Sequence, residues 1–268
     1  MNMMGPSHLS EAGYRILPRV YDRWQRSYGK DYSETILPRL LSSLRKYRIA
    51  GTTMVDVACG TGSLAILMAR EGWHATGVDA SEGMIACAAA KSEGTKLPLS
   101  FLRQDMRELR LEAPVHLATS FFDSLNHLLD EAELLETFRR VFLSLLPEAW
   151  FVFDTSNKRC FSTLWTMAET ITTDEFIMTL ENSYDPKSRL GKSVVTLEDL
   201  PAGGPAASPN AMVRRETETV LERCYGTGEI WGMLEKAGFV VRECDEFNFT
   251  SNPGVGNIKT WWVAQKRR

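Results

Sequence analysis

The stretch that most constrains this fold is residues 55–65, Val-Asp-Val-Ala-Cys-Gly-Thr-Gly-Ser-Leu-Ala. A β-favouring run leads into Gly60-x-Gly62 and continues directly into a helix-compatible segment. In open α/β folds, nucleotide-like ligands bind where a strand ends in such a turn before a helix. A second strand-like run ends at Asp79, seventeen residues after Gly62. Its carboxylate should lie at the tip of the neighbouring strand and accept hydrogen bonds from both hydroxyls of a ribose.

Strands and helices alternate from residue 53 to residue 154. We expect strands at about 53–58, 74–79, 99–104, 115–121 and 149–154. We expect helices at about 63–71 and 82–91, the second capped by Ser81, and a longer amphipathic helix capped by Asp130. A preceding helix, capped near Thr35, would hold Pro38 in its first turn. Alternation of this kind predicts a parallel sheet with right-handed crossovers.

The pattern changes after Asp154. Three Thr-, Glu- and Val-rich segments predict antiparallel strands at 171–180, 193–200 and 212–225, and residues 201–210 form a Pro/Gly-rich exposed loop. A helix at 228–237 and strands at 239–248 and 259–265 follow. The predicted division is N-terminal helices plus a cofactor-binding core (1–155), a β insertion that covers the substrate (156–225), and completion of the core sheet (226–268).

The bulk composition excludes several classes of protein. A net charge of -3 and the absence of a basic cluster argue against a nucleic-acid partner. The most apolar stretch, residues 141–153, is too short and too interrupted to cross a membrane. Five cysteines without a Cys-x-x-Cys pair predict neither disulfides nor a zinc site, and no other metal site is expected. We therefore expect a cytoplasmic protein.

The glycine turn alone does not identify the ligand. Nicotinamide-dependent oxidoreductases use a similar turn and a similarly spaced acid, and Ala65 satisfies their third small position. Asp56, however, lies inside the strand, four residues before Gly60. A carboxylate there suits a cofactor with an amino group and a positive sulfonium better than it suits a pyrophosphate.

Four ordered motifs resemble those of class I S-adenosylmethionine (SAM)-dependent methyltransferases. They are residues 55–62, Gly77-Val-Asp-Ala-Ser81, Gln104-Asp-Met106 and Phe122-Asp-Ser-Leu-Asn-His127. The style is that of small-molecule N-methyltransferases, such as glycine N-methyltransferase and the sugar-amine N,N-dimethyltransferases. The resemblance implies a Rossmann-like, doubly wound, seven-stranded α/β sheet with helices on both faces, an antiparallel last strand and a small antiparallel β insertion. One departure is Pro147-Glu148-Ala149, where the family has a Pro-Gly-Gly turn.

The same resemblance assigns roles to particular residues. Asp79 would hold the ribose, Asp105 and Met106 would flank the adenine, and the backbone at Ala58 and Phe121 would hold the methionine amino group. Tyr21 and Tyr32 would close over the cofactor. The remaining expected contacts to the cofactor are Asp56, which could equally be a structural residue, and Gly60, Gly62 and Ala80. Asp123 and His127 are candidates for contact with the substrate, although His127 could instead be a packing residue.

The sequence thus predicts SAM-dependent methyl transfer to a small-molecule acceptor, with an amine favoured. Methyl transfer requires that the protein position the two reactants and exclude water from the site, rather than supply a strong acid or base. No catalytic residue is therefore singled out. Two alternatives stay open, an NAD-dependent oxidoreductase and a catalytically idle SAM-binding protein. The acceptor and the oligomeric state are not determined by the sequence.

Overall fold

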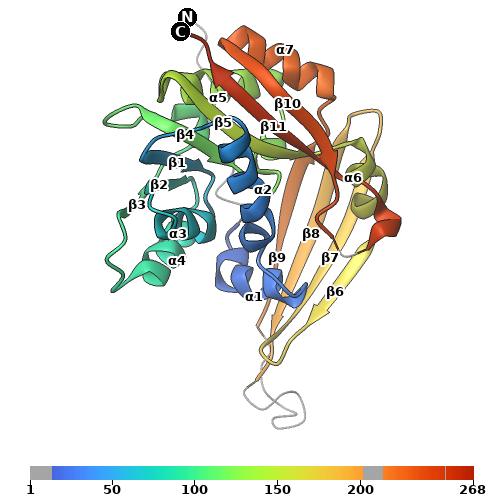
Figure 1. Ribbon diagram of the computed structural model, residues 1–268. Coiled ribbons are helices and arrows are strands. Elements are labelled where there is room, and N and C mark those ends of the chain that lie inside the picture. Colours follow the sequence, from blue (N-terminus) through green and yellow to red (C-terminus); the bar gives the residue numbers. More distant parts are fainter. Residues whose placement is uncertain (1–13, 202–213, 251) are drawn as a thin grey trace, which may run out of the picture.

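The computed structural model describes residues 14–201, 214–250 and 252–268, and its centre is a seven-stranded sheet (Figure 1). The strand order is β10-β11-β5-β4-β1-β2-β3. Strands β1 to β5 are parallel, and β11 is antiparallel to β5 and β10. This confirms the doubly wound sheet with an antiparallel last strand. The strands are β1 (Thr53–Val57), β2 (His74–Asp79), β3 (Leu99–Arg103), β4 (Val115–Ser120), β5 (Leu145–Ser156), β10 (Phe239–Phe247) and β11 (Lys259–Lys266).

Helices cover both faces of this sheet. On one face α5 and α7 bury Phe138 and Leu234 against β1, β4 and β5. On the other face α2 and α3 bury Leu40 and Met68 against the opposite side of the same strands. None of the helices in the described ranges is long and apolar enough to cross a membrane. The helices are α1 (Tyr21–Ser27), α2 (Tyr32–Lys46), α3 (Ser63–Arg70), α4 (Glu82–Ser92), α5 (Glu131–Leu143), α6 (Lys158–Thr163) and α7 (Thr227–Ala237), with 3-10 turns η1 (Leu17–Arg19), η2 (Met106–Glu108), η3 (Ser124–His127), η4 (Leu164–Thr166) and η5 (Pro253–Val255).

The expected helix starts are confirmed at two places and wrong at one. Ser81 and Asp130 are N-caps, as their side chains accept hydrogen bonds from backbone N–H groups of the first turns of α4 and α5. Helix α2, however, begins at Tyr32 with Asp31 as its cap rather than near Thr35. Pro38 therefore lies inside the helix. Proline has no N–H to donate to the carbonyl group four residues earlier in the helix. This side of α2 is exposed, so water can bind that carbonyl group instead.

The turn before the main part of β5 contains a left-handed residue that is not glycine. Glu148 has φ +63°, the left-handed conformation that glycine favours. The departure from Pro-Gly-Gly thus changes the residue but not the need for a positive φ at this turn.

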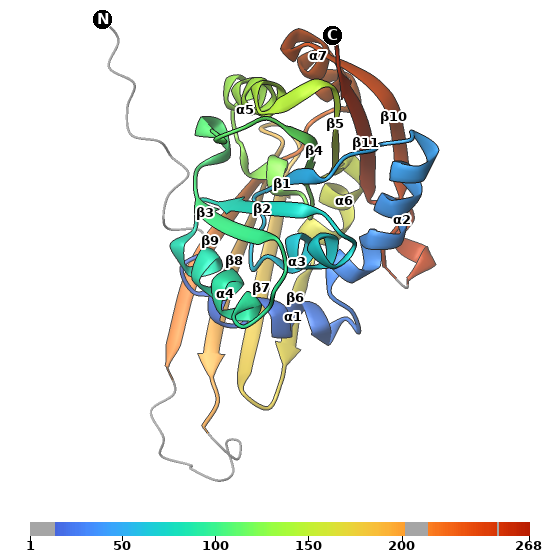
Figure 2. The same ribbon diagram turned by 60° about the vertical axis from the view of Figure 1, so that its left-hand side comes forward.

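A second, smaller antiparallel sheet has the order β6-β7-β8-β9 (Figure 2). Its strands are β6 (Ala168–Thr172), β7 (Phe176–Asp185), β8 (Leu190–Asp199) and β9 (Arg215–Arg223). The expectation of three strands was wrong, because residues 171–180 contain a tight turn. The Thr173 hydroxyl accepts the N–H of Phe176 at 3.0 Å and folds the segment into a hairpin. Most of the expected loop at 201–210 lies outside the described residues.

The N-terminal segment packs against one face of the small sheet. Ile16, Leu17 and Val20 share a core with apolar residues of β6 to β9. Glu218 of β9, 5% exposed, fastens this contact. Its carboxylate accepts the backbone N–H groups of Arg15 (2.7 Å), Ile16 (2.9 Å) and Leu17 (3.3 Å) at the start of η1.

Replacing Glu218 with alanine should detach residues 15–17 from β9. A hydrogen bond to a charged acceptor contributes about 1.5–3 kcal/mol. Because the three N–H groups can bind water once the segment detaches, we expect the unfolding free energy to fall by about the value of one such bond, about 2 kcal/mol. Amide hydrogen exchange at residues 15–17 should accelerate more than exchange in α5. Glu198→Ala, on the outer face of the same sheet, is the control. Unchanged exchange at residues 15–17 in Glu218→Ala would contradict the anchoring role.

Candidate cofactor and acceptor site

The turn after β1 is shaped by three positive φ angles. Ala58 (+56°), Gly60 (+55°) and Gly62 (+75°) all have left-handed backbone conformations. A Cβ on Gly62 would lie 2.6 Å from the ring of Phe101, so glycine is required for packing of the turn against β3. At Gly60 the nearest atom to such a Cβ would be 3.9 Å away, on Tyr21. Gly60 therefore presents bare backbone to an open space beneath the Tyr21 ring.

Asp79 spans the tips of β1 and β2. One carboxylate oxygen accepts the N–H of Gly60 at 2.9 Å and the other accepts the N–H of Ser81 at 2.8 Å. Burial raises the pKa of Asp79, and the two backbone hydrogen bonds oppose that rise. The carboxylate is thus fixed beside the glycine turn, with acceptor positions suited to a vicinal diol.

A cavity lies between these strand tips and the small sheet. Tyr14 and Tyr21 line it from the N-terminal segment, and Thr219, Val220 and Leu221 line it from β9. Of the expected site residues, those on its wall are Tyr21, Ala58, Gly60, Asp79, Met106 and His127. Those not on its wall are Tyr32, Asp56, Gly62, Ala80, Asp105, Phe121 and Asp123.

His127 is held in one orientation on the cavity wall. Its Nδ1 lies 3.3 Å from the carbonyl oxygen of Leu221, which requires the proton on Nδ1. Nε2 then accepts the hydroxyl of Tyr14 at 3.0 Å. Burial lowers the pKa of His127, although Asp123 opposes this shift, so the ring is neutral at neutral pH. The wall therefore carries an uncharged imidazole with its basic nitrogen directed toward Tyr14.

Asp56 and Asp105 are each engaged within the protein. Asp56 is 3% exposed and accepts the hydroxyl of Thr119 at 2.7 Å. Burial raises the pKa of Asp56 to about 7. Asp105 caps η2 and forms an ion pair at 2.6 Å with Arg107, which also binds Glu133. Both carboxylates support the strand ends, and Asp105 holds the turn that presents Met106.

The remaining expected residues also make internal contacts. Phe121 stacks on Trp261 with ring centroids 5.0 Å apart. The carbonyl of Ala80 accepts Arg103 Nε at 3.2 Å. Tyr32 donates its hydroxyl to Asp154 at 2.5 Å.

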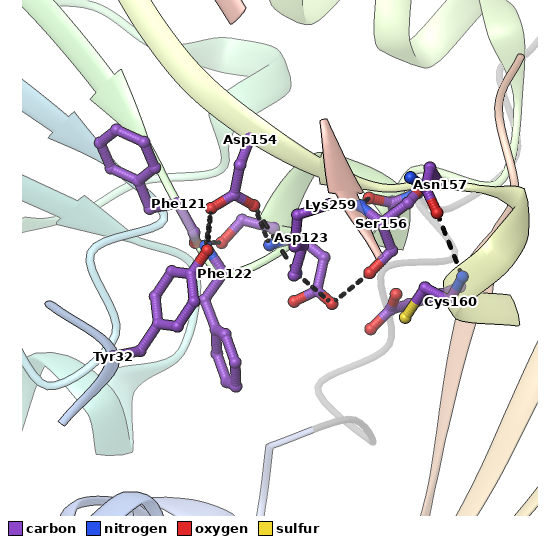
Figure 3. Close-up of polar contacts among 12 residues, drawn as sticks. Tyr32, Phe121, Phe122, Asp123, Asp154, Ser156, Asn157, Cys160 and Lys259 are labelled. Atoms are coloured by element: carbon purple, nitrogen blue, oxygen red, sulfur yellow. Dashed lines mark hydrogen bonds and ion pairs between the residues drawn. The ribbon is translucent and has the colours of Figure 1, made fainter. Parts of the chain in front are cut away.

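Sequence reasoning did not find Lys259, which organises the loop after β4 (Figure 3). Its side chain is 1% exposed, and Nζ lies 2.7 Å from Asp123 and 3.6 Å from Asp154. Asp154 also accepts the backbone N–H groups of Phe122 and Asp123. Only the pairing of strands could have indicated the role of Lys259, because the antiparallel register places this residue opposite Ser156 at the end of β5.

A second network pins α1 to the glycine turn. Lys91 of α4 lies 2.6 Å from Asp22 of α1 and donates to the hydroxyls of Thr61 (2.8 Å) and Ser63 (2.9 Å). Thr61 also donates to Asp22 at 2.5 Å. The segment that carries Tyr21 is thus tied to the turn beneath it.

Replacing Lys91 with methionine should loosen α1. A partly exposed ion pair of this kind contributes about 1 kcal/mol at most, so amide exchange in α1 should accelerate several-fold. Lys96→Met, an exposed lysine after the same helix, serves as the control. Equal exchange rates in α1 of the wild type and Lys91→Met would show that Lys91 does not hold the segment.

Comparison with known proteins agrees with this arrangement. The methyltransferase domain family matches residues 54–148. A putative methyltransferase of Geobacillus sp. (strain WCH70) is 34% identical over 247 residues, covering 92% of this chain and 93% of that protein. The dTDP-3-amino-3,6-dideoxy-alpha-D-glucopyranose N,N-dimethyltransferase of Streptomyces fradiae is 28% identical over 138 residues, 52% of each chain. A solved SAM-dependent methyltransferase from Clostridium acetobutylicum has a TM-score of 0.78 at 19% identity, covering 95% of this chain and 99% of that one.

The fold and these matches define a class I SAM-dependent methyltransferase, and the chain belongs to that family. Within the family, the likeness to the Geobacillus protein extends over nearly the whole chain. SAM is therefore the cofactor, and methyl transfer replaces the nicotinamide oxidoreductase alternative.

Proposed function

We propose that this enzyme transfers a methyl group from SAM to the nitrogen of a small-molecule amine. One observation carries the proposal: a single cavity joins the Asp79–Gly60 corner to the neutral imidazole of His127. The end of the cavity at Asp79 and Gly60 is suited to the adenosine of SAM. The end at His127 is suited to an amine that must lose a proton. The Streptomyces fradiae relative, named as an N,N-dimethyltransferase of an amino sugar, supports nitrogen as the acceptor atom.

The residues present fit SAM. The backbone at Gly60 leaves open space, and Asp79 offers a fixed carboxylate for the ribose hydroxyls. Met106 lies on the cavity wall where the adenine would extend, with Asp105 and Ala80 at the ends of the neighbouring strands. The backbone at Ala58 and Phe121 is proposed to hold the methionine amino group. Asp56 behind the turn, Gly62 within it, and Tyr21 and Tyr32 over it complete the proposed site.

Bound SAM supplies an electrophilic methyl group on a positively charged sulfur. The protein excludes water with the rings of Tyr14, Tyr21 and Phe122, which line the cavity. The Tyr14 hydroxyl, which donates to His127 Nε2, could accept a proton from the substrate amine while its own proton passes to Nε2, and this would free the lone pair of the amine nitrogen. Asp123 positions the loop that carries His127, because its carboxylate is bound by Lys259 and Ser156.

We propose that three consecutive parts of the chain serve two different roles. Residues 1–155 and 226–268 would form the SAM-binding core, and residues 156–225 would cover the acceptor and set specificity. We further expect a cytoplasmic enzyme without a nucleic-acid partner. All five cysteines lie in the described ranges as free thiols, which suits a reducing compartment.

Trideuteriomethyl-labelled SAM offered with a library of primary and secondary amines tests the function. We expect S-adenosylhomocysteine (SAH) and products that carry the label on nitrogen, identified by mass spectrometry. The matched alcohols and thiols of the same carbon skeletons are the comparison. Label transferred to oxygen, sulfur or carbon instead would contradict an amine acceptor.

A further inference from the structure

A buried carboxyl group lies behind His127, at the end of the cavity where the methyl acceptor is proposed to bind. Glu222 of β9 is 5% exposed, and its Oε1 lies 3.7 Å from Nε2 of His127 on the cavity wall. Its Oε2 is fully buried and has no hydrogen-bond partner. A buried polar atom without a partner is costly, so the Glu222 carboxyl group has unused hydrogen-bonding capacity at this place.

The charges around Glu222 do not balance. Among the described residues whose charges shift the pKa of Glu222, Asp123 and Asp154 are acidic and Lys259 is basic. Lys259 is committed to Asp123 at 2.7 Å and Asp154 at 3.6 Å. Asp154 receives further donors from Tyr32 and from the backbone. Glu222 is therefore the member of the group that lacks a counter-charge.

No lysine or arginine lines the cavity within the described residues. Three basic side chains elsewhere in the described residues have acidic partners: Lys91 pairs with Asp22, Arg107 with Asp105, and Arg223 with Glu131. Residues 1–13 and 202–213 contain no lysine or arginine in their sequence. Phosphate groups are normally bound by Arg or Lys side chains. The cavity is thus poorly suited to a phosphorylated acceptor.

We propose that the acceptor is a small cationic amine without phosphate, whose ammonium group binds beside His127 with Glu222 as its buried counter-charge. This inference rests on the proposed function, because it names the chemical class of the amine. The aromatic rings of Tyr14, Tyr21 and Phe122 on the same cavity wall add favourable surfaces for a cation. It also separates this enzyme from relatives whose named acceptors are dTDP-sugars.

Binding of such a cation should release a proton. Burial raises the pKa of Glu222 well above its usual range, and the charge of Asp123 adds to this, while Lys259 opposes it. Burial therefore favours the protonated form of Glu222 in the free protein, and a cation nearby favours its ionised form. Affinity for the cation should then increase with pH up to the pKa of Glu222. The titratable and charged groups around Glu222 are Tyr14, Asp123, His127, Asp154, Cys160 and Lys259.

Calorimetric titration of the protein–SAH complex with three matched probes tests the proposal. The probes are cyclohexylammonium, cyclohexanol and cyclohexyl phosphate. We expect the ammonium to bind at least about tenfold more tightly than the alcohol, and the phosphate to bind most weakly. Titrations in two buffers of different ionisation enthalpy should show net release of protons when the ammonium binds.

Glu222→Gln should abolish both the ammonium preference and the proton release. Glu198→Gln, the same change on the outer face of the small sheet, should alter neither. The wild-type measurements stand without the variants if Glu222→Gln folds poorly. Tightest binding of the phosphate, or no preference among the probes, including no binding of any, would overturn the proposal. Ammonium preference without N-methylated products would instead refute only the proposed function.

Discussion

Asp79→Ala is expected to weaken binding of SAM and SAH by about 100-fold or more. The Asp79 carboxylate is fixed by the N–H groups of Gly60 and Ser81, and it would accept two hydrogen bonds from the ribose. Hydrogen bonds to a charged group contribute about 1.5–3 kcal/mol each, so losing two removes at least two orders of magnitude in affinity. Isothermal titration calorimetry with SAH measures the change directly.

Two further variants define the cause of that loss. Asp79→Asn keeps the size of the side chain and one acceptor oxygen, so its affinity should be intermediate. Glu82→Ala removes an exposed carboxylate from the first turn of α4 and should leave the affinity unchanged. Wild-type affinity in Asp79→Ala, with an intact fold by circular dichroism, would show that the ribose lies elsewhere.

Lys259→Met should be the most destabilising of the substitutions considered. The side chain is 1% exposed, and its loss leaves Asp123 and Asp154 buried without their cation. Removing one partner of a buried ion pair lowers stability by about 3–5 kcal/mol. Chemical denaturation at pH 8 measures this loss. Lys46→Met, which removes an exposed ion pair with Glu243, should change stability little.

The destabilisation by Lys259→Met should shrink as pH falls. Burial alone would raise the pKa of Asp123, but Lys259 and Ser156 hold it below its usual value in the wild type. Without Lys259 this pKa rises, so the folded variant takes up protons as pH falls and gains stability relative to the wild type. Lys259 itself has a raised pKa and stays charged across pH 5–8, so it adds no slope in the wild type. A stability difference that is constant over this pH range would contradict the account.

Local sequence signals predicted the core well. The strand–turn–helix at residues 53–70 and the caps Ser81 and Asp130 depend on neighbours within a few residues, and the structure confirms them. The resemblance to a known family added the antiparallel orientation of β11. The start of α2 was wrong because Pro38 was assumed to belong to a first turn, whereas Asp31 offers a cap one turn earlier.

Residues that act through distant partners could not be found in this way. Lys259, Glu218 and Glu222 each lie in strands with ordinary alternation, and their partners are about 100 to 200 positions away. Their roles become visible only in three contacts of the fold: the pairing of β11 with β5, the docking of the N-terminal segment on β9, and the contact of β9 with η3. The hairpin at Thr173 was missed because its turn contains neither glycine nor proline.

A crystal structure of the protein with SAH tests the central claim most directly. The adenosine should lie across the tips of β1 and β2, with both ribose hydroxyls within hydrogen-bond distance of the Asp79 carboxylate and the backbone of Gly60 beneath the ligand. SAH bound outside this corner, or an Asp79 side chain turned away from the ribose, would contradict it.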